Sequence, residues 1–264
     1  MGVFDPRAYW EERLESAKGL EGVGYVGLGH AFNTWMYRVR RHVFKRVVRS
    51  HMDVSDQGSV LDVGSGTGVY LRLWKELGAR QVSGCDITDT AVARLGKELP
   101  EVDLFRMDIS EGHAKLNGTY DAVSCMDVLF HVVEEERFDK AIANLAGALK
   151  PKGLLFISGN FPHRETQSEK HFIIRGIERY EAAIAAAGLQ VVDRRPMFHL
   201  LNRPMDTDSR GLHWWWDFVE RVCRASYKLG GLLGAVVYPL ELLLVRSRRE
   251  GVSTEMMVCV RVHP

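Results

Sequence analysis

The feature that most constrains the fold is the segment from Val60 to Gly68, where an apolar run enters a turn with glycine at every second position. A turn without side chains lets a ligand lie against the backbone, and a strand that feeds such a turn opens a βα unit. The dinucleotide-binding fingerprint requires glycine at the sixth position of the turn. This chain has Val69 there and places its glycine at the fifth position, so a dinucleotide-dependent redox enzyme is disfavoured.

Acidic residues follow two further predicted strands. Val82–Asp86 is a short apolar run that ends in an acid, 24 residues after Asp62. An acid at about this distance along a βαβ unit is placed to accept hydrogen bonds from ribose hydroxyls. A third run, Val102–Met107, leads to Asp108. Two later segments complete the series, a fourth strand with its exit at 120–132 and a turn with a fifth strand at 148–157.

These five landmarks, in this order, resemble the motifs of the class I S-adenosylmethionine (SAM)-dependent methyltransferases. The resemblance covers roughly residues 55–160 closely, and it departs at Lys152, where glycine is commoner in the family. In that family the glycine loop wraps the amino-acid end and the ribose of SAM. The resemblance therefore implies SAM as the cofactor and methyl transfer as the activity.

The resemblance also implies which residues bind SAM. Asp86 would hold the ribose, and Asp108 would take the adenine amino group, with apolar neighbours that cover the ring. An aromatic residue and an arginine before the glycine loop would reach the SAM carboxylate, a group that suits an arginine fork. The predicted SAM-binding set is Tyr37, Arg41, Asp62, Gly64, Ser65, Gly66, Gly68, Asp86, Ile87, Met107, Asp108, Ile109 and Met126.

Composition narrows the partners and the compartment. The net charge of +1 argues against a general nucleic-acid binder, which would show a strong basic excess. The N-terminal residues lack the charged and apolar regions of a signal peptide. The four cysteines are scattered and show no metal-ligand spacing, which is typical of buried thiols in a reducing compartment. We expect a cytoplasmic protein with a small-molecule substrate, no nucleic-acid partner and no metal site.

Strands and helices alternate through the middle of the chain. This alternation predicts an α/β fold with a doubly wound, mostly parallel seven-stranded sheet and helices on both faces. Ligands on such sheets bind beyond the carboxyl ends of the strands, where the predicted site residues fall. We divide the chain into an N-terminal helical lid at 1–51, a SAM-binding core at 52–198, a helical insert at 199–252 and the last core strand at 253–264.

The N-terminal segment is predicted to hold two helices. The second has apolar residues at steps of three and four from Phe32 to Val47. Its opposite face is strongly basic. A solvated surface is the favoured interpretation of that face, and Tyr37, Arg38 and Arg41 are the candidates for contact with the SAM carboxylate.

The insert at 199–252 is longer than the hairpin that the core needs. It contains the triplet Trp214–Trp216 and an apolar run, 229–245, interrupted only by Pro239 and Glu241. A membrane-spanning helix needs about 20 apolar residues. We favour a cap whose aromatic residues face the space above Gly64 and Met126. A buried helical hairpin, a homodimer interface and, less favoured, contact with a membrane surface remain the alternatives.

Methyl transfer needs an aligned acceptor, a dry site and, for some acceptors, a base. Histidine suits the last task because its ordinary pKa is about 6.5. His131 and His163 follow the fourth and fifth predicted strands and are the predicted catalytic residues. We expect transfer to an oxygen or nitrogen of a small, partly apolar molecule. The alternatives are a SAM-using enzyme that cyclises the SAM aminobutyl chain and a non-catalytic SAM-binding partner protein.

Overall fold

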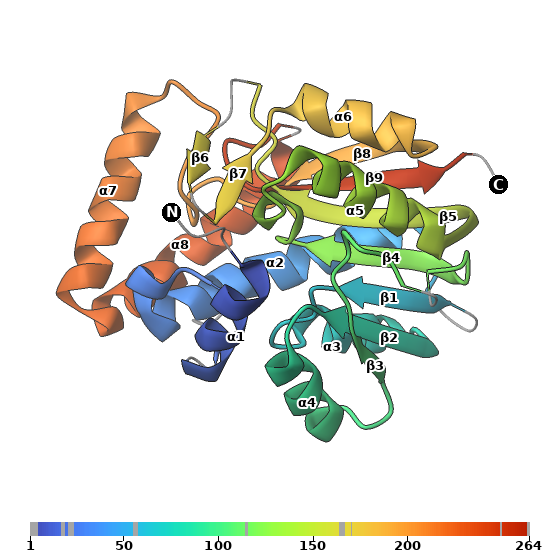
Figure 1. Cartoon of the computed structure of the whole chain (residues 1–264). Helices are drawn as coiled ribbons and strands as arrows, with labels where there is room; N and C mark the ends of the chain where they lie inside the picture. Colours follow the sequence, from blue (N-terminus) through green and yellow to red (C-terminus); the bar gives the residue numbers. More distant parts are fainter. Residues whose placement is uncertain are drawn as a thin grey trace.

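The computed structural model describes residues 5–16, 19–20, 24–54, 58–113, 116–163, 167–169, 171–248 and 250–262. These residues form one seven-stranded sheet and a separate two-stranded one (Figure 1). The strands of the large sheet are β1 (Ser59–Val63), β2 (Gln81–Asp86), β3 (Asp103–Arg106), β4 (Tyr120–Met126), β5 (Leu149–Gly159), β8 (Leu189–Pro196) and β9 (Glu255–Arg261). The small sheet pairs β6 (Gln167–Glu169) with β7 (Phe172–Ile174).

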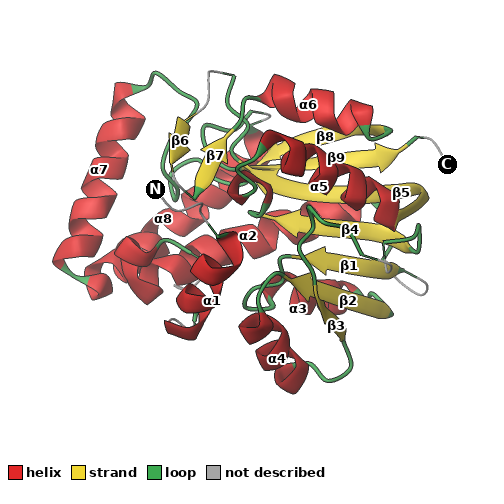
Figure 2. Ribbon diagram, in the orientation of Figure 1, coloured by secondary structure: helices red, strands yellow, loops and turns green. Residues whose placement is uncertain are grey.

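The helices of the chain lie around this sheet (Figure 2). They are α1 (Pro6–Ser16), α2 (Gly29–His51), α3 (Val69–Leu77), α4 (Asp89–Glu98), α5 (Glu135–Ala148), α6 (Ile177–Ala186), α7 (Arg210–Ala225) and α8 (Tyr227–Ser247). The described residues also form the short 3-10 turns η2 (Val26–Leu28) and η3 (Leu129–His131). The insert before the last strand is helical, as the sequence predicts.

The large sheet has the strand order β3-β2-β1-β4-β5-β9-β8. Pairs from β3 to β5 are parallel, and β9 runs antiparallel to both of its neighbours. The predicted doubly wound, mostly parallel seven-stranded sheet is therefore confirmed. The order reverses beside β1, so the turns after β1 and β4 flank the switch point at which such sheets bind ligands.

Two apolar clusters cover the two faces of the sheet. On one face, buried side chains of α2, α3 and α8 pack with Trp74 and Phe156. On the other, α5 and α6 contribute Phe138 and Tyr180, whose rings meet edge to face at 5.1 Å. Every residue of β1 is buried, because a central strand of a parallel sheet has helices on both sides.

The β6–β7 hairpin was not predicted, because strands of three residues are too short to show a period and β6 is entirely polar. The α7–α8 hairpin is anchored by one carboxylate. Glu241 of α8 is fully buried and accepts hydrogen bonds from the backbone N–H groups of His199 (2.6 Å) and Leu200 (2.7 Å). Burial raises the pKa of Glu241, and these donors oppose that shift.

Candidate functional site

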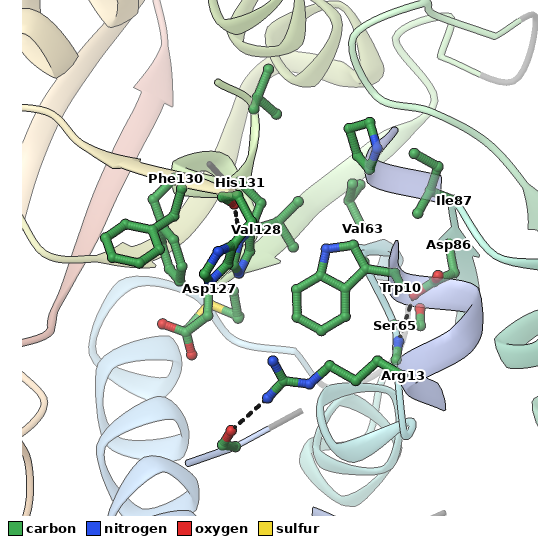
Figure 3. A pocket seen from close by; sticks show the side chains of 18 of the residues that line it. Trp10, Arg13, Val63, Ser65, Asp86, Ile87, Asp127, Val128, Phe130 and His131 are labelled. Carbon is green, nitrogen blue, oxygen red and sulfur yellow. Dashed lines mark hydrogen bonds between the residues drawn. The ribbon is translucent and has the colours of Figure 1, made fainter. Parts of the chain in front are cut away.

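A cavity of about 710 Å³ opens at the carboxyl ends of β1, β2 and β4 (Figure 3). Its volume lies in the range of small-molecule sites. The turns after these strands line it, together with residues of α1 and α2. Trp10 projects from α1 between the glycine-turn side and the η3 side of the cavity.

The turn after β1 brings bare backbone to the cavity. Gly64, Gly66 and Gly68 have φ values of 73°, 49° and 76°, a region that L-residues with side chains avoid. A Cβ on Gly64 would lie 2.3 Å from a methyl group of Val128. The N–H groups of Gly64 and Ser65 donate to the carbonyl of Cys85, which ties the turn to β2. Gly64, Ser65 and Gly66 line the cavity, whereas Gly68 caps α3 and does not.

Asp86 occupies the end of β2 and lines the same cavity. Its carboxylate accepts hydrogen bonds from the N–H of Gly66 (2.8 Å) and from the N–H and Oγ1 of Thr88 (3.0 and 2.7 Å). Burial raises the pKa of Asp86, and the hydrogen bonds oppose the shift. The acid at the end of the second strand is therefore coupled directly to the glycine turn.

The turn after β3 supplies apolar residues and a second acid. Met107 and Ile109 are buried cavity residues, and Ile87 lines the cavity beside them. Asp108 accepts hydrogen bonds from Ser110 and forms an ion pair with Arg137 of α5, which also lines the cavity. The carboxylate is thus fixed by a cation that the sequence did not single out.

The helix α2 presents a different arginine to the cavity from the one predicted. Tyr37 lines the cavity as expected, but Arg41 does not, because it pairs with Glu76 of α3. The next residue toward the N-terminus, Arg40, reaches inward and pairs with Asp127 just after β4. A helix turns by about 100° per residue, so a shift of one position moves a side chain to another face.

Arg13 of α1 is a second cationic group of the cavity. Its guanidinium donates to the carbonyl of Gly24 (2.9 Å) and to the hydroxyl of Tyr9 (3.1 Å), and it lies 5.0 Å from the centre of the Trp10 ring. Figure 3 shows its side chain extending into the cavity below Trp10. These contacts hold the cation in place on the segment that closes the site.

The acceptor-side residues follow β4. Met126 and Phe130 line the cavity, and Asp127 has a positive φ of 60° that directs its carboxylate to Arg40 and to the Ser158 hydroxyl (3.0 Å). His131 lines the cavity too. Its Nδ1 lies 2.9 Å from the carbonyl oxygen of His171, an acceptor that requires a proton on that nitrogen. Nε2 therefore carries the lone pair.

Burial lowers the pKa of His131 from 6.5 to about 4. The ring is thus neutral at physiological pH and is a weak base. A lone pair on a buried neutral imidazole is well suited to accept a hydrogen bond from a hydroxyl group. The position of His131 agrees with the sequence-based expectation, while its ionisation favours orientation of an acceptor over removal of its proton.

Two further predicted residues, Asp62 and His163, lie off the cavity. Asp62 is buried behind the glycine turn and accepts a hydrogen bond from the Ser124 hydroxyl (2.6 Å). Burial raises its pKa from 3.8 to about 7. His163 points away from the cavity into a pair with Asp206 at 2.7 Å, with its side chain 56% exposed. The structure thus gives no support for a catalytic role of His163.

The expectation that Trp214–Trp216 cover the site is wrong. Among the described residues that line the cavity, none belongs to α7 or α8. Trp215 donates to the carbonyl of Leu200, and Trp216 is buried against Tyr25 and Phe32. Only the loop before α7 reaches the cavity, through Asn202, Arg203 and Met205.

No cluster of three or more potential metal ligands occurs among the residues that the structure describes.

Sequence reasoning missed Trp10, Arg13, Arg40 and Arg137. Of these, only Arg40 had a usable signal, since it lies on the same helix as the predicted Tyr37. The others reach the cavity by tertiary packing of α1 and α5, which no local pattern records.

Residues 60–153 match a protein family described as "Methyltransferase domain". The "Ubiquinone biosynthesis O-methyltransferase" of Xanthomonas oryzae pv. oryzae is 40% identical over 103 residues, which cover 38% of this chain and 41% of that protein. The protein of the same description from Neisseria meningitidis serogroup C is 28% identical over 182 residues, or 59% and 74% of the two chains. The matched part therefore spans about two fifths of the first relatives' length.

Solved structures share the fold at low sequence identity. Magnesium protoporphyrin IX methyltransferase from Synechocystis PCC 6803 with bound SAM aligns with a TM-score of 0.58 and 16% identity, over 99% of each chain. A putative sarcosine dimethylglycine methyltransferase from Galdieria sulphuraria gives a TM-score of 0.57 and 14% identity, over 84% of this chain and 85% of that one. At these identities the likeness concerns the fold alone.

Proposed function

We propose that this chain is a class I SAM-dependent methyltransferase and that it transfers a methyl group from SAM to an oxygen atom of a small, partly apolar molecule. The names of the curated relatives support oxygen rather than nitrogen as the acceptor. The proposed compartment is the cytoplasm, in keeping with four cysteines that are all free and buried.

One observation carries this proposal. Asp86 and the backbone of the Gly64–Gly66 turn are hydrogen-bonded to each other and line one cavity. A carboxylate at the end of the second strand is placed to accept hydrogen bonds from two ribose hydroxyls. The turn offers a surface free of side chains next to it. The pair therefore fits the adenosine half of SAM.

The remaining cavity residues fit the other parts of the cofactor. Ile87, Met107 and Ile109 form apolar walls suited to the adenine ring. At the opposite side, Arg13 and Tyr37 are placed to bind the amino-acid carboxylate, in place of the predicted Arg41. Burial raises the pKa of Tyr37 to about 12, so its hydroxyl stays protonated and can donate.

Bound SAM supplies a methyl group on a sulfonium, which is an excellent leaving group. The task left to the protein is to align the acceptor and to exclude water. We assign the alignment to Nε2 of the neutral His131, which can accept a hydrogen bond from an acceptor hydroxyl. We assign the exclusion of water to α1, since Trp10 contacts His131 edge-on at 4.8 Å and covers the cavity.

The proposal is tested by titration calorimetry of SAM with the full chain and with Asp86→Asn. The substitution keeps the shape of the side chain and removes its charge. We expect the affinity for SAM to fall about tenfold or more, because a hydrogen bond to a charged group contributes about 1.5–3 kcal/mol. Asp139→Asn, which alters an exposed ion pair with Arg179, is the matched control and should bind SAM normally.

Equal affinity of Asp86→Asn and the native chain would refute this placement of the cofactor. The product distinguishes the reactions that the sequence left open. S-adenosylhomocysteine is expected from methyl transfer, whereas methylthioadenosine would indicate cyclisation of the aminobutyl chain. Tight binding without either product would favour a SAM-binding partner protein.

A further inference from the structure

The outer side of α8 is a continuous apolar stripe. It consists of Leu229, Leu232, Val236, Leu240 and Leu243, which are 49–67% exposed. Their spacing of three, four, four and three residues places them on one side of the helix. At 1.5 Å per residue the stripe is about 21 Å long. Single exposed apolar residues are ordinary, but a stripe of this length marks an interaction surface.

The neighbouring helix carries exposed aromatic residues as well. Trp214 and Phe218 of α7 lie four residues apart, with parallel rings 6.1 Å between centres, and Trp214 is 65% exposed. Tyr227 is exposed at the corner between the helices. We call this combined surface the apolar hairpin face, made of Trp214, Phe218, Tyr227 and the α8 stripe. Tryptophan and tyrosine are typical of the boundary between lipid and water.

The inner side of α8 is already used by the chain itself. A Cβ on Gly231 would lie 2.7 Å from Ala31, and one on Gly234 would lie 2.6 Å from the Trp35 ring, so α8 packs closely on α2. Glu241 is held on this side by two backbone N–H groups. The helix is long and apolar enough to cross a membrane, but a crossing would detach these contacts. The geometry instead fits a helix that lies on a surface.

A basic cluster borders the apolar hairpin face. It surrounds a hollow between α2 and α8, and among the described residues that line it none is acidic. Its members are Arg38, Arg41, His42, Lys45, Arg46, Arg49 and Arg246. Glu76 of α3 pairs with Arg41 and Lys45 at its side. Burial and then the neighbouring Arg195 and Arg246 lower the pKa of Arg46, which shows the mutual repulsion of these cations.

From the apolar hairpin face and the basic cluster beside it, we propose that the α7–α8 hairpin docks the protein on the surface of an anionic lipid bilayer. Apolar side chains would enter the headgroup boundary, and the arginines would meet anionic headgroups. An anionic bilayer complements both the apolar hairpin face and the basic cluster. A second copy of the chain would cover the apolar face but would bring a second basic cluster to the same interface.

The docked hairpin is connected to the cavity wall. Trp216 on the inner side of α7 meets the Tyr25 ring edge-on, with 5.9 Å between centres, and Tyr25 lines the cavity. The bilayer would therefore lie on the far side of a helix that contacts the segment leading from α1 into α2. The proposal itself does not depend on the reaction performed in the cavity.

The test is flotation of the full chain with two kinds of vesicles, phosphatidylcholine alone and equimolar phosphatidylcholine and phosphatidylglycerol. We expect binding to the anionic vesicles that weakens as salt is added. Leu232→Glu combined with Val236→Glu should lower the partition coefficient by about tenfold or more, since charges are unfavourable at membrane depth. Val192→Glu, at an exposed apolar position on β8, is the matched control and should bind as the native chain does.

A second pair of variants tests the charges. Arg49→Ala combined with Arg246→Ala should weaken binding to anionic vesicles by roughly tenfold, because each basic residue near such a surface contributes attraction. Lys97→Ala combined with Lys140→Ala removes the same charge from other exposed helix positions and should have no effect. Circular dichroism and thermal unfolding verify that each variant is folded.

Three results would overturn the proposal. The first is a native chain that remains unbound with both vesicles, and the second is unchanged flotation of the Leu232→Glu, Val236→Glu variant. The third is a dimer, detected by light scattering, that this variant abolishes while vesicle binding is absent. That result would assign the face to a second copy of the chain.

Discussion

The strand ends around the cavity and the α7–α8 hairpin both stand out in the sequence, but their side chains face different surroundings. Gly64 and Gly66 after β1 and the acids Asp86 and Asp108 at the ends of β2 and β3 line one cavity. The aromatic and apolar residues of the hairpin either pack against α2 or point outward, and none of those described lines the cavity. A ligand site depends on backbone position, whereas the direction of an apolar helix face depends on what the rest of the chain leaves uncovered.

The comparison implies that damage to the hairpin and damage to the strand ends have different consequences. Hairpin substitutions should reduce stability and leave cofactor affinity intact. Strand-end substitutions should reduce affinity more than stability.

The largest expected effect is that of Glu241→Ala. It leaves the N–H groups of His199 and Leu200 without an acceptor, which costs about 2–6 kcal/mol at about 1–3 kcal/mol for each group. Chemical denaturation measures this loss. The SAM affinity of the folded fraction, from calorimetry, should stay within about twofold of the native value because α8 is absent from the cavity wall. A large loss of SAM affinity in the folded variant would show that the hairpin and the cavity are energetically coupled.

The second prediction concerns Asp62, which lies behind the site. Its pKa is raised from 3.8 to about 7 by burial, so between these values the folded chain keeps a proton that the unfolded chain releases. The stability from the protonated carboxyl is complete below pH 3.8 and is lost as pH rises through about 7. Asp62→Asn removes this dependence and should gain up to about 4 kcal/mol relative to the native chain between pH 4 and 8.

Denaturation curves of both proteins across that pH range measure the difference. The lowered pKa of His131 acts in the opposite direction, since stability then rises from pH 4 to 6.5. Both proteins contain His131, so its contribution cancels in the comparison. Parallel stability profiles would show that Asp62 does not retain its proton.

The third prediction targets the glycine turn. Gly64→Ala places a side chain at a φ of 73°, where its Cβ meets Val128 at 2.3 Å. We expect SAM affinity to fall about 100-fold, because the turn must move away from the ligand. Gly96→Ala in α4 is the matched control, since nothing lies within 4 Å of its Cβ. It should bind SAM normally and gain about 0.5–1 kcal/mol in stability.

Much of the fold and part of the site could be predicted from local sequence. Gly64, Asp86 and Asp108 each lie at or just after the carboxyl end of a strand, and parallel strands bring these ends together. The same logic failed where a residue reaches the site through packing. Arg137 arrives from α5 and Trp10 from α1, and neither has a neighbour in sequence that reveals its partner.

The α7–α8 hairpin likewise shows that local sequence does not reveal tertiary packing. The apolar run 229–245 correctly predicts a helix, but its periodicity does not determine which side of the helix packs against the rest of the protein. Gly231 and Gly234 decide this, because only small residues allow α8 to approach α2 closely. The stripe opposite them is then left uncovered. Pattern alone could not separate a cap from an outward-facing surface.

The choice between Arg13 and Arg41 is the sharpest remaining test of sequence against structure. The resemblance favours Arg41, whereas the structure places Arg13 in the cavity and pairs Arg41 with Glu76. Arg13→Met keeps much of the side-chain volume and removes a cation from the proposed carboxylate site. SAM affinity should fall about tenfold, in line with about 1.5 kcal/mol for a hydrogen bond to a charged group.

Arg41→Met is the matched variant on α2. It removes an exposed ion pair, and exposed pairs contribute about 0–1 kcal/mol, so both SAM affinity and stability should stay close to native values. Calorimetry with SAM and with adenosine separates the carboxylate from the nucleoside: Arg13→Met should weaken SAM and leave adenosine unaffected. Equal weakening of both ligands would mean that Arg13 shapes the cavity instead of binding the carboxylate. A loss confined to Arg41→Met would restore the assignment made from the sequence and require α2 to rotate when the ligand binds.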